Sequence, residues 1–313
     1  MTWVPSTSGP WVRGSMVALG WAVLMVVSPL AEAQVAEPAK RLELRTSTQK
    51  TLDTIAGDLD GVMGFVIVDI TSGERFERLP GESFPLASTI KIAILYELFK
   101  QAEEGRLKLD VVQPLDKRHV VGGSGVLNHL SAPAMSLRDY AVLMIVLSDN
   151  SATNLLIDTV GMENVRKRMA AAGLPGLQLR RRMIDLEAAK RGDENIGSPD
   201  DLARLLLMIH KGEGLQPASR DGILQILRKP KTSALRDGVP PSVPVANKTG
   251  SLEGVAADAG IVYITDRPYI FVATTTYLKS GAAGNDAIRA ASRAAFDYFD
   301  RVARSSEFGR VIR

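Results

Sequence analysis

The chain has 313 residues, of which 38 are Lys or Arg and 35 are Asp or Glu, so its formal net charge is only +3. Basic residues are interspersed with acids and their densest cluster is three arginines long, which argues against nucleic acid as a partner. With no cysteine and only three histidines, none in a metal-binding spacing, the chain is expected to use no metal and no other cofactor.

Residues 1–33 are expected to be a signal peptide. A single charge, Arg13, precedes the apolar run from Met16 to Val27, and Ala31-Glu32-Ala33 offers a small-residue cleavage site. The run is short for a membrane span, so no stable membrane insertion is expected, and an uncleaved anchor is the alternative. We therefore expect an exported protein, periplasmic or secreted, that is a monomer.

Residues 34–313 are expected to form one catalytic domain in which strands at both ends flank a helical region. Hydrophobic periodicity and turn signals predict helices over 41–59, 88–104, 136–147, 151–160, 162–172, 199–211 and 285–302. Strands are predicted over 64–70, 74–79, 243–249, 259–265 and 269–277. The expected fold class is therefore α/β (α+β): an antiparallel sheet from 40–85 and 213–313, flanked by helices, with an all-helical insert over 86–212.

Ser88 and Lys91 stand at the start of the first predicted helix of the insert. They are one turn apart, so their side chains share a face, and the helix N-terminus favours negative charge developing at the serine. A desolvated lysine has a lowered pKa and can accept the proton of a serine nucleophile. The alternative is a capping serine followed by a lysine that extends its ammonium to solvent.

Ser148-Asp149-Asn150 forms a short polar break between two apolar helices. In such a break Ser148 can pass a proton to a leaving nitrogen, and Asn150 can bind a substrate amide. A loop that only caps the next helix is the alternative, because Ser, Asp and Asn are favoured capping residues.

Lys248-Thr249-Gly250 ends a predicted strand, where a glycine lets a ligand approach the backbone. Lys248 and Thr249 are expected to bind a substrate carboxylate, and the backbone N–H groups of Ser88 and Ser251 to form an oxyanion hole. A strand end that simply enters a turn is the alternative.

Together these three motifs give the chain a resemblance to class A β-lactamases and their serine-hydrolase relatives in the penicillin-binding superfamily. The resemblance extends over residues 34–313, and the sixty positions from Ser88 to Ser148 agree with the family's spacing. It implies that Ser88 is the nucleophile, Lys91 its activating amine and Ser148 the proton relay. Asn150, Lys248, Thr249, Gly250 and Ser251 would then bind the substrate, a small-molecule β-lactam or a peptidoglycan-like compound.

The chain departs from this family at two places. The family's loop aligns with residues 181–195, and there Met183 occupies the position of the glutamate that activates the hydrolytic water. Glu187 falls at the water-holding position, so it is the candidate for that role, with a solvated helix charge as the alternative. The strand after Lys248-Thr249-Gly250 lacks the arginine that often grips the substrate carboxylate, and Arg236 is expected to be structural.

These observations favour a secreted serine hydrolase that opens β-lactam rings through an acyl-enzyme. One alternative is a penicillin-binding D-Ala-D-Ala peptidase or esterase with slow deacylation. A second is a sensor of β-lactams or peptidoglycan fragments that stays acylated. Met183 favours these alternatives, whereas the length of the domain favours the hydrolase.

Overall fold

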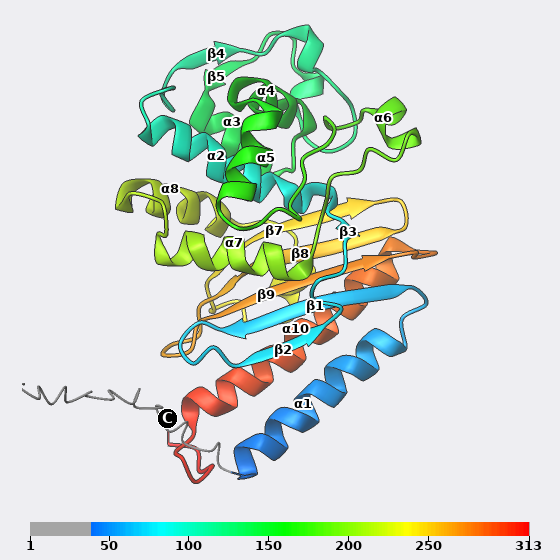
Figure 1. Ribbon diagram of the computed structural model, residues 1–313, viewed down its shortest axis with the longest axis vertical. Helices are drawn as coiled ribbons and strands as arrows, with labels where there is room; N and C mark the ends of the chain where they lie inside the picture. The colour runs from blue at the N-terminus through cyan, green and yellow to red at the C-terminus, as the bar shows by residue number, and fades with distance from the viewer. Residues whose placement is uncertain (1–38, 313) are drawn as a thin grey trace, which may run out of the picture. The chain divides into compact units, whose positions relative to one another are not determined.

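The computed structural model describes residues 39–312, in which a five-stranded antiparallel sheet separates two layers of helices (Figure 1). The strand order is β2-β1-β9-β8-β7, so strands from the two ends of the chain lie side by side. Their bounds are β1 Val62–Asp69, β2 Arg75–Arg78, β7 Val245–Leu252, β8 Val255–Val262 and β9 Tyr269–Thr276. The predicted mixed class with one antiparallel sheet is confirmed.

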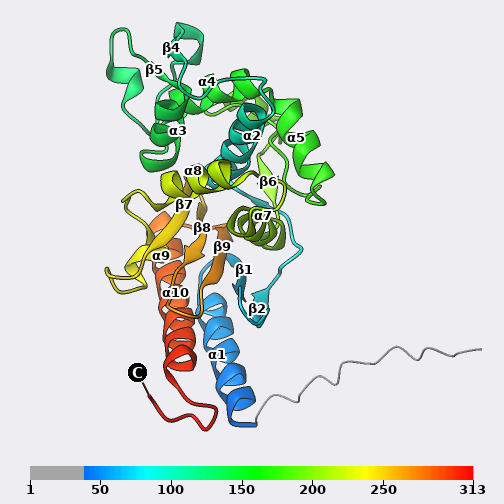
Figure 2. The same cartoon turned by 90° about the vertical axis from the view of Figure 1, so that its left-hand side faces the viewer.

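One face of the sheet is covered by the long helices α1 (Ala39–Gly57) and α10 (Gly281–Arg304), which lie beside each other (Figures 1 and 2). Between them and the sheet lies a hydrophobic core that contains Phe65, Phe271 and Phe299. Alternate residues of a strand point to opposite faces, and here both faces are buried. This explains why β8 and β9 read as nearly continuous apolar runs.

The other face carries the helical part of the molecule, with its own, larger core. Its helices are α2 Lys91–Glu103, α3 Leu137–Val146, α4 Asn150–Val160, α5 Met162–Ala171, α6 Leu186–Lys190, α7 Pro199–Lys211 and α8 Pro217–Arg228. The four-residue helix α9 (Ala234–Asp237) lies instead on the face covered by α1 and α10, where it packs against α10. Ten of the thirteen residues of α2 are buried, so this helix forms the centre of that core. Among residues 39–312, no helix combines the length and the apolar character that a membrane span requires.

The region expected to be purely helical also contains short strands. They form two small two-stranded sheets, β3 (Phe84–Pro85) with β6 (Ile196–Gly197), and β4 (Val112–Pro114) with β5 (Ala134–Ser136). Three short 3₁₀ turns complete the set: η1 Ala87–Ile90, η2 Lys117–His119 and η3 Leu127–His129. Strands of two or three residues are too short for periodicity to reveal, which is why the sequence prediction missed them.

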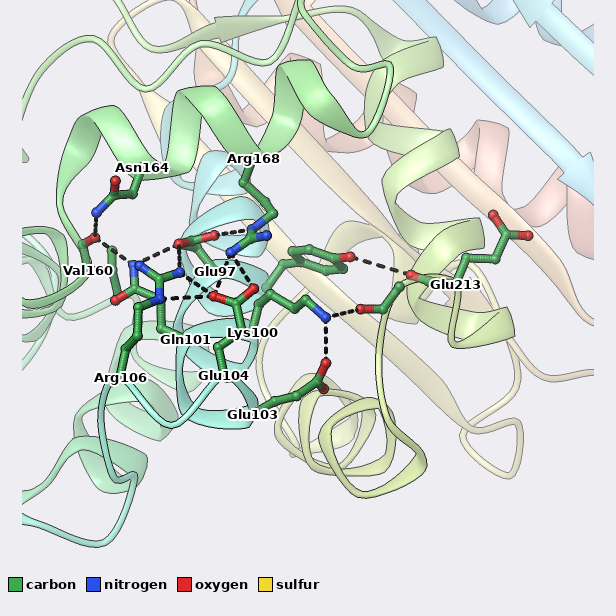
Figure 3. Close-up of polar contacts among 12 residues, drawn as sticks. Glu97, Lys100, Gln101, Glu103, Glu104, Arg106, Val160, Asn164, Arg168 and Glu213 are labelled. Atoms are coloured by element: carbon green, nitrogen blue, oxygen red, sulfur yellow. Dashed lines mark hydrogen bonds and ion pairs between the residues drawn. The ribbon is translucent and has the colours of Figure 1, made fainter.

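A buried polar cluster links α2 to α5 (Figure 3). The Glu97 carboxylate is 1% exposed and accepts hydrogen bonds from Arg168 Nε at 2.8 Å and from Gln101 Nε2 at 2.7 Å. Arg168 also pairs with Glu104 at 2.9 Å. Because a buried carboxylate is tolerated only when it is paired, this cluster links the two helices firmly.

Candidate active site

Ser88 lies in η1, immediately before α2, and faces a pocket of about 240 Å³. The α-helix proper begins at Lys91, three residues later than predicted, and no side chain caps the turn. The preceding residue, Ala87, has φ of +47°, an uncommon left-handed conformation for a residue other than glycine. Such local strain is often found where a backbone must present a reactive side chain.

The Lys91 side chain, three residues after Ser88, is fully buried. Its Nζ donates hydrogen bonds to the Ser148 carbonyl oxygen at 2.8 Å, to Ser148 Oγ at 3.1 Å and to Asn150 Oδ1 at 3.1 Å. Burial lowers the pKa of Lys91 well below its usual value, and the positive charge of Lys248 lowers it further, while Asp149 opposes both effects. Lys91 therefore has the environment that a lysine needs in order to act as a proton acceptor near neutral pH.

Ser148 joins the two lysines of the site. Its Oγ is 3.1 Å from Lys91 Nζ and 3.1 Å from Lys248 Nζ, so a proton on this hydroxyl has a nitrogen on either side. Ser148 has φ of +54° in the break between α3 and α4. The break is held by Asp149, whose carboxylate caps α4 through the Ala152 amide at 2.9 Å and accepts the Leu127 amide at 2.9 Å.

Strand β7 brings Lys248 into contact with this group. Lys248 is fully buried, and its Nζ donates to the Thr249 carbonyl oxygen at 2.8 Å as well as to Ser148. Burial lowers the pKa of Lys248 to about 7, against an opposing effect of the Asp258 charge. A Cβ on Gly250 would lie 2.9 Å from the Leu86 carbonyl oxygen and 3.2 Å from the Ser88 nitrogen, so only glycine allows β7 to pack this closely on η1.

The other predicted substrate-binding residues border the same pocket. Asn150 and Ser251 line it, and Asn150 Nδ2 donates to the Gly122 carbonyl oxygen at 3.2 Å. Thr249 is half-buried on β7 between Lys248 and Gly250. The structure therefore joins Lys91, Ser148, Asn150 and Lys248 by hydrogen bonds and places Asn150 with Ser88 and Ser251 on one pocket.

Glu187 is the exception, because the structure does not bring it to the pocket. It lies in the short helix α6, its side chain is 75% exposed, and its carboxylate pairs with Lys190 at 2.8 Å. The expectation that Glu187 holds the hydrolytic water is thus replaced by the alternative of a solvated helix charge. Asp185 accepts the Ala188 amide at 2.9 Å and caps this helix.

Met183 lines the pocket and is 7% exposed. Its backbone is held by one amide: Met183 N donates to Asn154 Oδ1 at 2.8 Å, and Asn154 Nδ2 donates to the Met183 oxygen at 3.2 Å. Ile184 follows with φ of +60°, a genuine strain for a β-branched residue. An apolar side chain is thus held firmly in the pocket that Ser88 lines.

Sequence reasoning missed the residues that close this loop. Glu194 lines the pocket, but its carboxylate is bound by Arg181 Nη2 at 2.8 Å and Nε at 3.2 Å. Asn195 Oδ1 accepts the Arg181 amide at 3.0 Å, and its carbonyl oxygen accepts the Leu86 amide at 2.8 Å. The loop is therefore attached to the segment that carries Ser88. For Asn154 a signal existed, since it lies one helical turn after Asn150 on the same face.

Behind β7, Arg236 donates from Nε to Asn247 Oδ1 at 2.8 Å and from Nη2 to the Val245 carbonyl oxygen at 2.5 Å. Its predicted structural role is confirmed by these contacts. Within residues 39–312, no group of three or more His, Cys, Asp or Glu side chains is arranged to hold a metal ion.

Comparison with known proteins agrees with this geometry. The sequence model of the beta-lactamase enzyme family matches residues 47–299. An imipenem-hydrolyzing beta-lactamase of Enterobacter cloacae is 31% identical over 257 residues, which are 79% of this chain and 87% of that protein.

Solved structures agree as well. The structure of PBP-A superposes with a TM-score of 0.76 at 29% identity, covering 82% of this chain and 96% of that one. A leucine-to-glutamate variant of PBP-A, solved as its acyl-enzyme with penicillin G, gives a TM-score of 0.75 at 29% identity over 83% and 97% of the two chains. The chain described here belongs to the beta-lactamase enzyme family and is a serine hydrolase of that family.

Proposed function

We propose that this chain hydrolyses β-lactam rings through an acyl-enzyme on Ser88, and that deacylation is its slow step. The observation that carries the acylation half is the Ser148 hydroxyl, 3.1 Å from both Lys91 Nζ and Lys248 Nζ. Relatives named as beta-lactamases support the same activity, among them the imipenem-hydrolyzing protein of Enterobacter cloacae.

In the proposed acylation step Lys91 accepts the Ser88 proton as Oγ attacks the lactam carbonyl carbon. The carbonyl oxygen becomes an oxyanion that the N–H groups of Ser88 and Ser251 stabilise. The C–N bond of the ring then breaks, and the nitrogen takes a proton from the Ser148 hydroxyl, which Lys91 replenishes. Lys248 and Thr249 bind the substrate carboxylate, and Asn150 borders the acyl side chain.

The slow deacylation follows from what surrounds the acyl group. Hydrolysis of an ester at neutral pH needs a base that activates water. Glu194 is the one carboxylate among the residues that line the pocket, and it is already bound to Arg181. Met183 offers no proton acceptor, so we propose that water attacks with little assistance.

Slow deacylation also favours a second candidate, a penicillin-binding peptidase whose acyl-enzyme persists with β-lactams. The similarity to PBP-A, of which one variant is known as an acyl-enzyme with penicillin G, supports it. The two candidates share the acylation chemistry and differ in how fast the ester on Ser88 is hydrolysed. Export by residues 1–33, which lie outside the described residues, remains a proposal for either.

Three serines line the pocket, and they allow a matched test of the nucleophile: Ser88, Ser124 and Ser251. Intact mass spectrometry after mixing with benzylpenicillin should show an adduct with the wild type, with Ser124→Ala and with Ser251→Ala. Ser88→Ala should show none. An adduct that persists in Ser88→Ala and disappears in either of the other variants would overturn the assignment.

A further inference from the structure

Lys248 is a buried cation without a negative charge in contact with it. It is fully buried, and the acceptors of its Nζ are a hydroxyl and a backbone carbonyl, which are both neutral. Burying an ammonium group strongly disfavours its charged form unless an anion compensates. Yet Lys248 must be protonated in order to attract the carboxylate of a substrate. Some other residue has to supply the compensating charge.

Asp258 on β8 is placed to supply it. Asp258 is paired in register with Thr249, the residue that follows Lys248 on β7. Because neighbouring residues of a strand alternate between the two faces, Asp258 and Thr249 share one face of the sheet and Lys248 points from the other. Asp258 is 1% exposed and Lys248 is 0% exposed, so no layer of water screens their attraction across the sheet.

Burial raises the pKa of Asp258, but its hydrogen bonds and the charge of Lys248 oppose this effect and favour the ionised form. Its Oδ2 accepts from Ser233 Oγ at 2.6 Å and from the Leu235 amide at 3.1 Å, and its Oδ1 accepts from Asn247 Nδ2 at 2.7 Å. Ser233 Oγ in turn accepts from the Arg236 amide and from Asn247 Nδ2, so its own proton is directed at Asp258. Every partner donates and none could accept a proton from a neutral Asp258, an arrangement that favours the carboxylate.

Three further cations surround this pair. The charge of Asp258 also acts on Lys231, between α8 and α9, and on Arg236 of α9, whereas Lys91 of α2 contacts Ser148. Lys231 Nζ donates only to the Leu227 and Lys229 carbonyl oxygens, and its pKa is lowered by burial, by Arg236 and by Lys248. Asp149 is the other nearby anion, and its charge acts on Lys91. Asp258 therefore acts on three cations: Lys248, Lys231 and Arg236.

We propose that Asp258 is the counter-charge of Lys248, and that its balance against Lys231 and Arg236 decides up to which pH the site binds an anionic substrate. Asp258 is a positioning residue: it touches no substrate and acts through Lys248 and through the strand that carries Thr249. This inference rests on the proposed function for its catalytic consequence. The protonation of Lys248 itself can be measured without any turnover.

The test is a titration of Lys248 by NMR in protein labelled with ¹³C at the lysine ε-carbons, with the resonance assigned by its loss in Lys248→Arg. Asp258→Asn should lower the pKa of Lys248 by about one unit, as expected for removing a nearby opposite charge. Lys231→Met should raise it, because it removes a competing cation. Asp237→Asn, the same exchange at a carboxylate of α9 that is 53% exposed, should leave it within about 0.2 units, because solvent screens this charge.

Activity gives the second readout. For benzylpenicillin, the alkaline limb of kcat/KM should move to lower pH in Asp258→Asn by the same amount as the titration. For the methyl ester of benzylpenicillin, which lacks the carboxylate, the alkaline limb of kcat/KM should stay at the same pH in Asp258→Asn.

An unaltered pKa of Lys248 in Asp258→Asn would overturn the inference. If this variant does not fold, an unaltered or lowered pKa in Lys231→Met would overturn it. Failure of every variant and of the wild type to react with penicillin would instead overturn the proposed function and leave the titration result standing.

Discussion

At the scale of single residues, the site combines two buried lysines with one hydroxyl that contacts both. Repulsion between two buried ammonium groups favours a state in which one of them is neutral. Burial and the charge of Lys248 both lower the pKa of Lys91, and we expect Lys91 to be the neutral lysine of the pair. The arrangement thus prepares a base at Lys91 and keeps a cation at Lys248 for the substrate.

We expect Met183 to determine how long the acyl-enzyme lasts. We expect Met183→Glu to accelerate deacylation at least tenfold, because it places a carboxylate in the pocket where a base can activate water. The rate is measured by following loss of the benzylpenicillin adduct after excess drug is removed. Glu187→Gln is the matched control, and its 75% exposed side chain predicts an unchanged rate. No gain in a folded Met183→Glu protein would contradict the role given to this position.

The grouping of Lys91, Ser148, Asn150 and Lys248 could be predicted from the sequence because their motifs are short and local. Glu187 could not be placed in this way. Its direction depends on where α6 begins, and that five-residue helix is set by the Asp185 cap and by the strained Ile184. Asp258 lies on β8, the strand that lacks the family's arginine. Its role depends on Ser233 and Asn247, which meet it only in the folded chain.

At the scale of elements, the site depends on how closely β7 packs on η1. Gly250→Ala should reduce acylation by benzylpenicillin about 10- to 100-fold, because the new Cβ would push β7 away from Ser88 and shift Lys248. Stopped-flow measurement of the acylation rate checks this. Gly57→Ala, where nothing lies within 4 Å of the added Cβ, should acylate like the wild type. Equal rates in all three proteins would contradict the tight contact.

The helix that carries Lys91 depends on the cluster around Glu97 (Figure 3). Glu97→Gln should lower the free energy of unfolding by about 2–3 kcal/mol, because it leaves Arg168 and Arg106 without their buried partner. Urea denaturation measures the change. Glu163→Gln, at a surface pair with Lys167 on α5, should cost less than about 0.5 kcal/mol. Similar losses of unfolding free energy in the two variants would show that the buried cluster contributes no more to stability than a surface ion pair.

Most long elements agree with the sequence prediction within a few residues, because long amphipathic or apolar segments have a clear period. Helix α7 agrees at both ends, since Ser198 caps it, Pro199 begins it and Gly212 ends it in a left-handed conformation. Helix α8 was not predicted. It has no side-chain cap and contains Gly222, whose missing Cβ makes room for Phe99 of α2. The occurrence of a glycine at position 222 is therefore explained by its packing against Phe99, which the sequence of α8 alone does not reveal.

At the scale of the whole molecule, the sheet separates two cores, and the catalytic charges are buried along its β7 edge. Such burial costs stability, and the cost depends on pH. An unfolded lysine holds its proton up to a pH of about 10.4, whereas burial lowers the pKa of Lys231 to about 7. Between these two pKa values Lys231 must release its proton when the chain folds. Lys231 therefore makes the free energy of unfolding increase with pH up to about 10.

Lys231→Met should therefore raise the free energy of unfolding by at least about 1 kcal/mol at pH 7, even though two carbonyl oxygens lose a donor. The gain should stay constant below pH 7, shrink as the pH rises and disappear above about 10.5. Urea denaturation at a series of pH values gives this curve. A difference between variant and wild type that does not change with pH would contradict the account of this buried lysine.

The most direct test of the central claim is a time course of intact mass with excess benzylpenicillin, with free drug followed in the same tube. Acylation on Ser88 followed by slower hydrolysis predicts an adduct that accumulates, persists while drug is consumed over many turnovers, and then disappears. An unmodified protein throughout, with no loss of drug, would contradict the proposed acyl-enzyme. An adduct that remains after one equivalent of drug would contradict hydrolysis and identify a penicillin-binding peptidase.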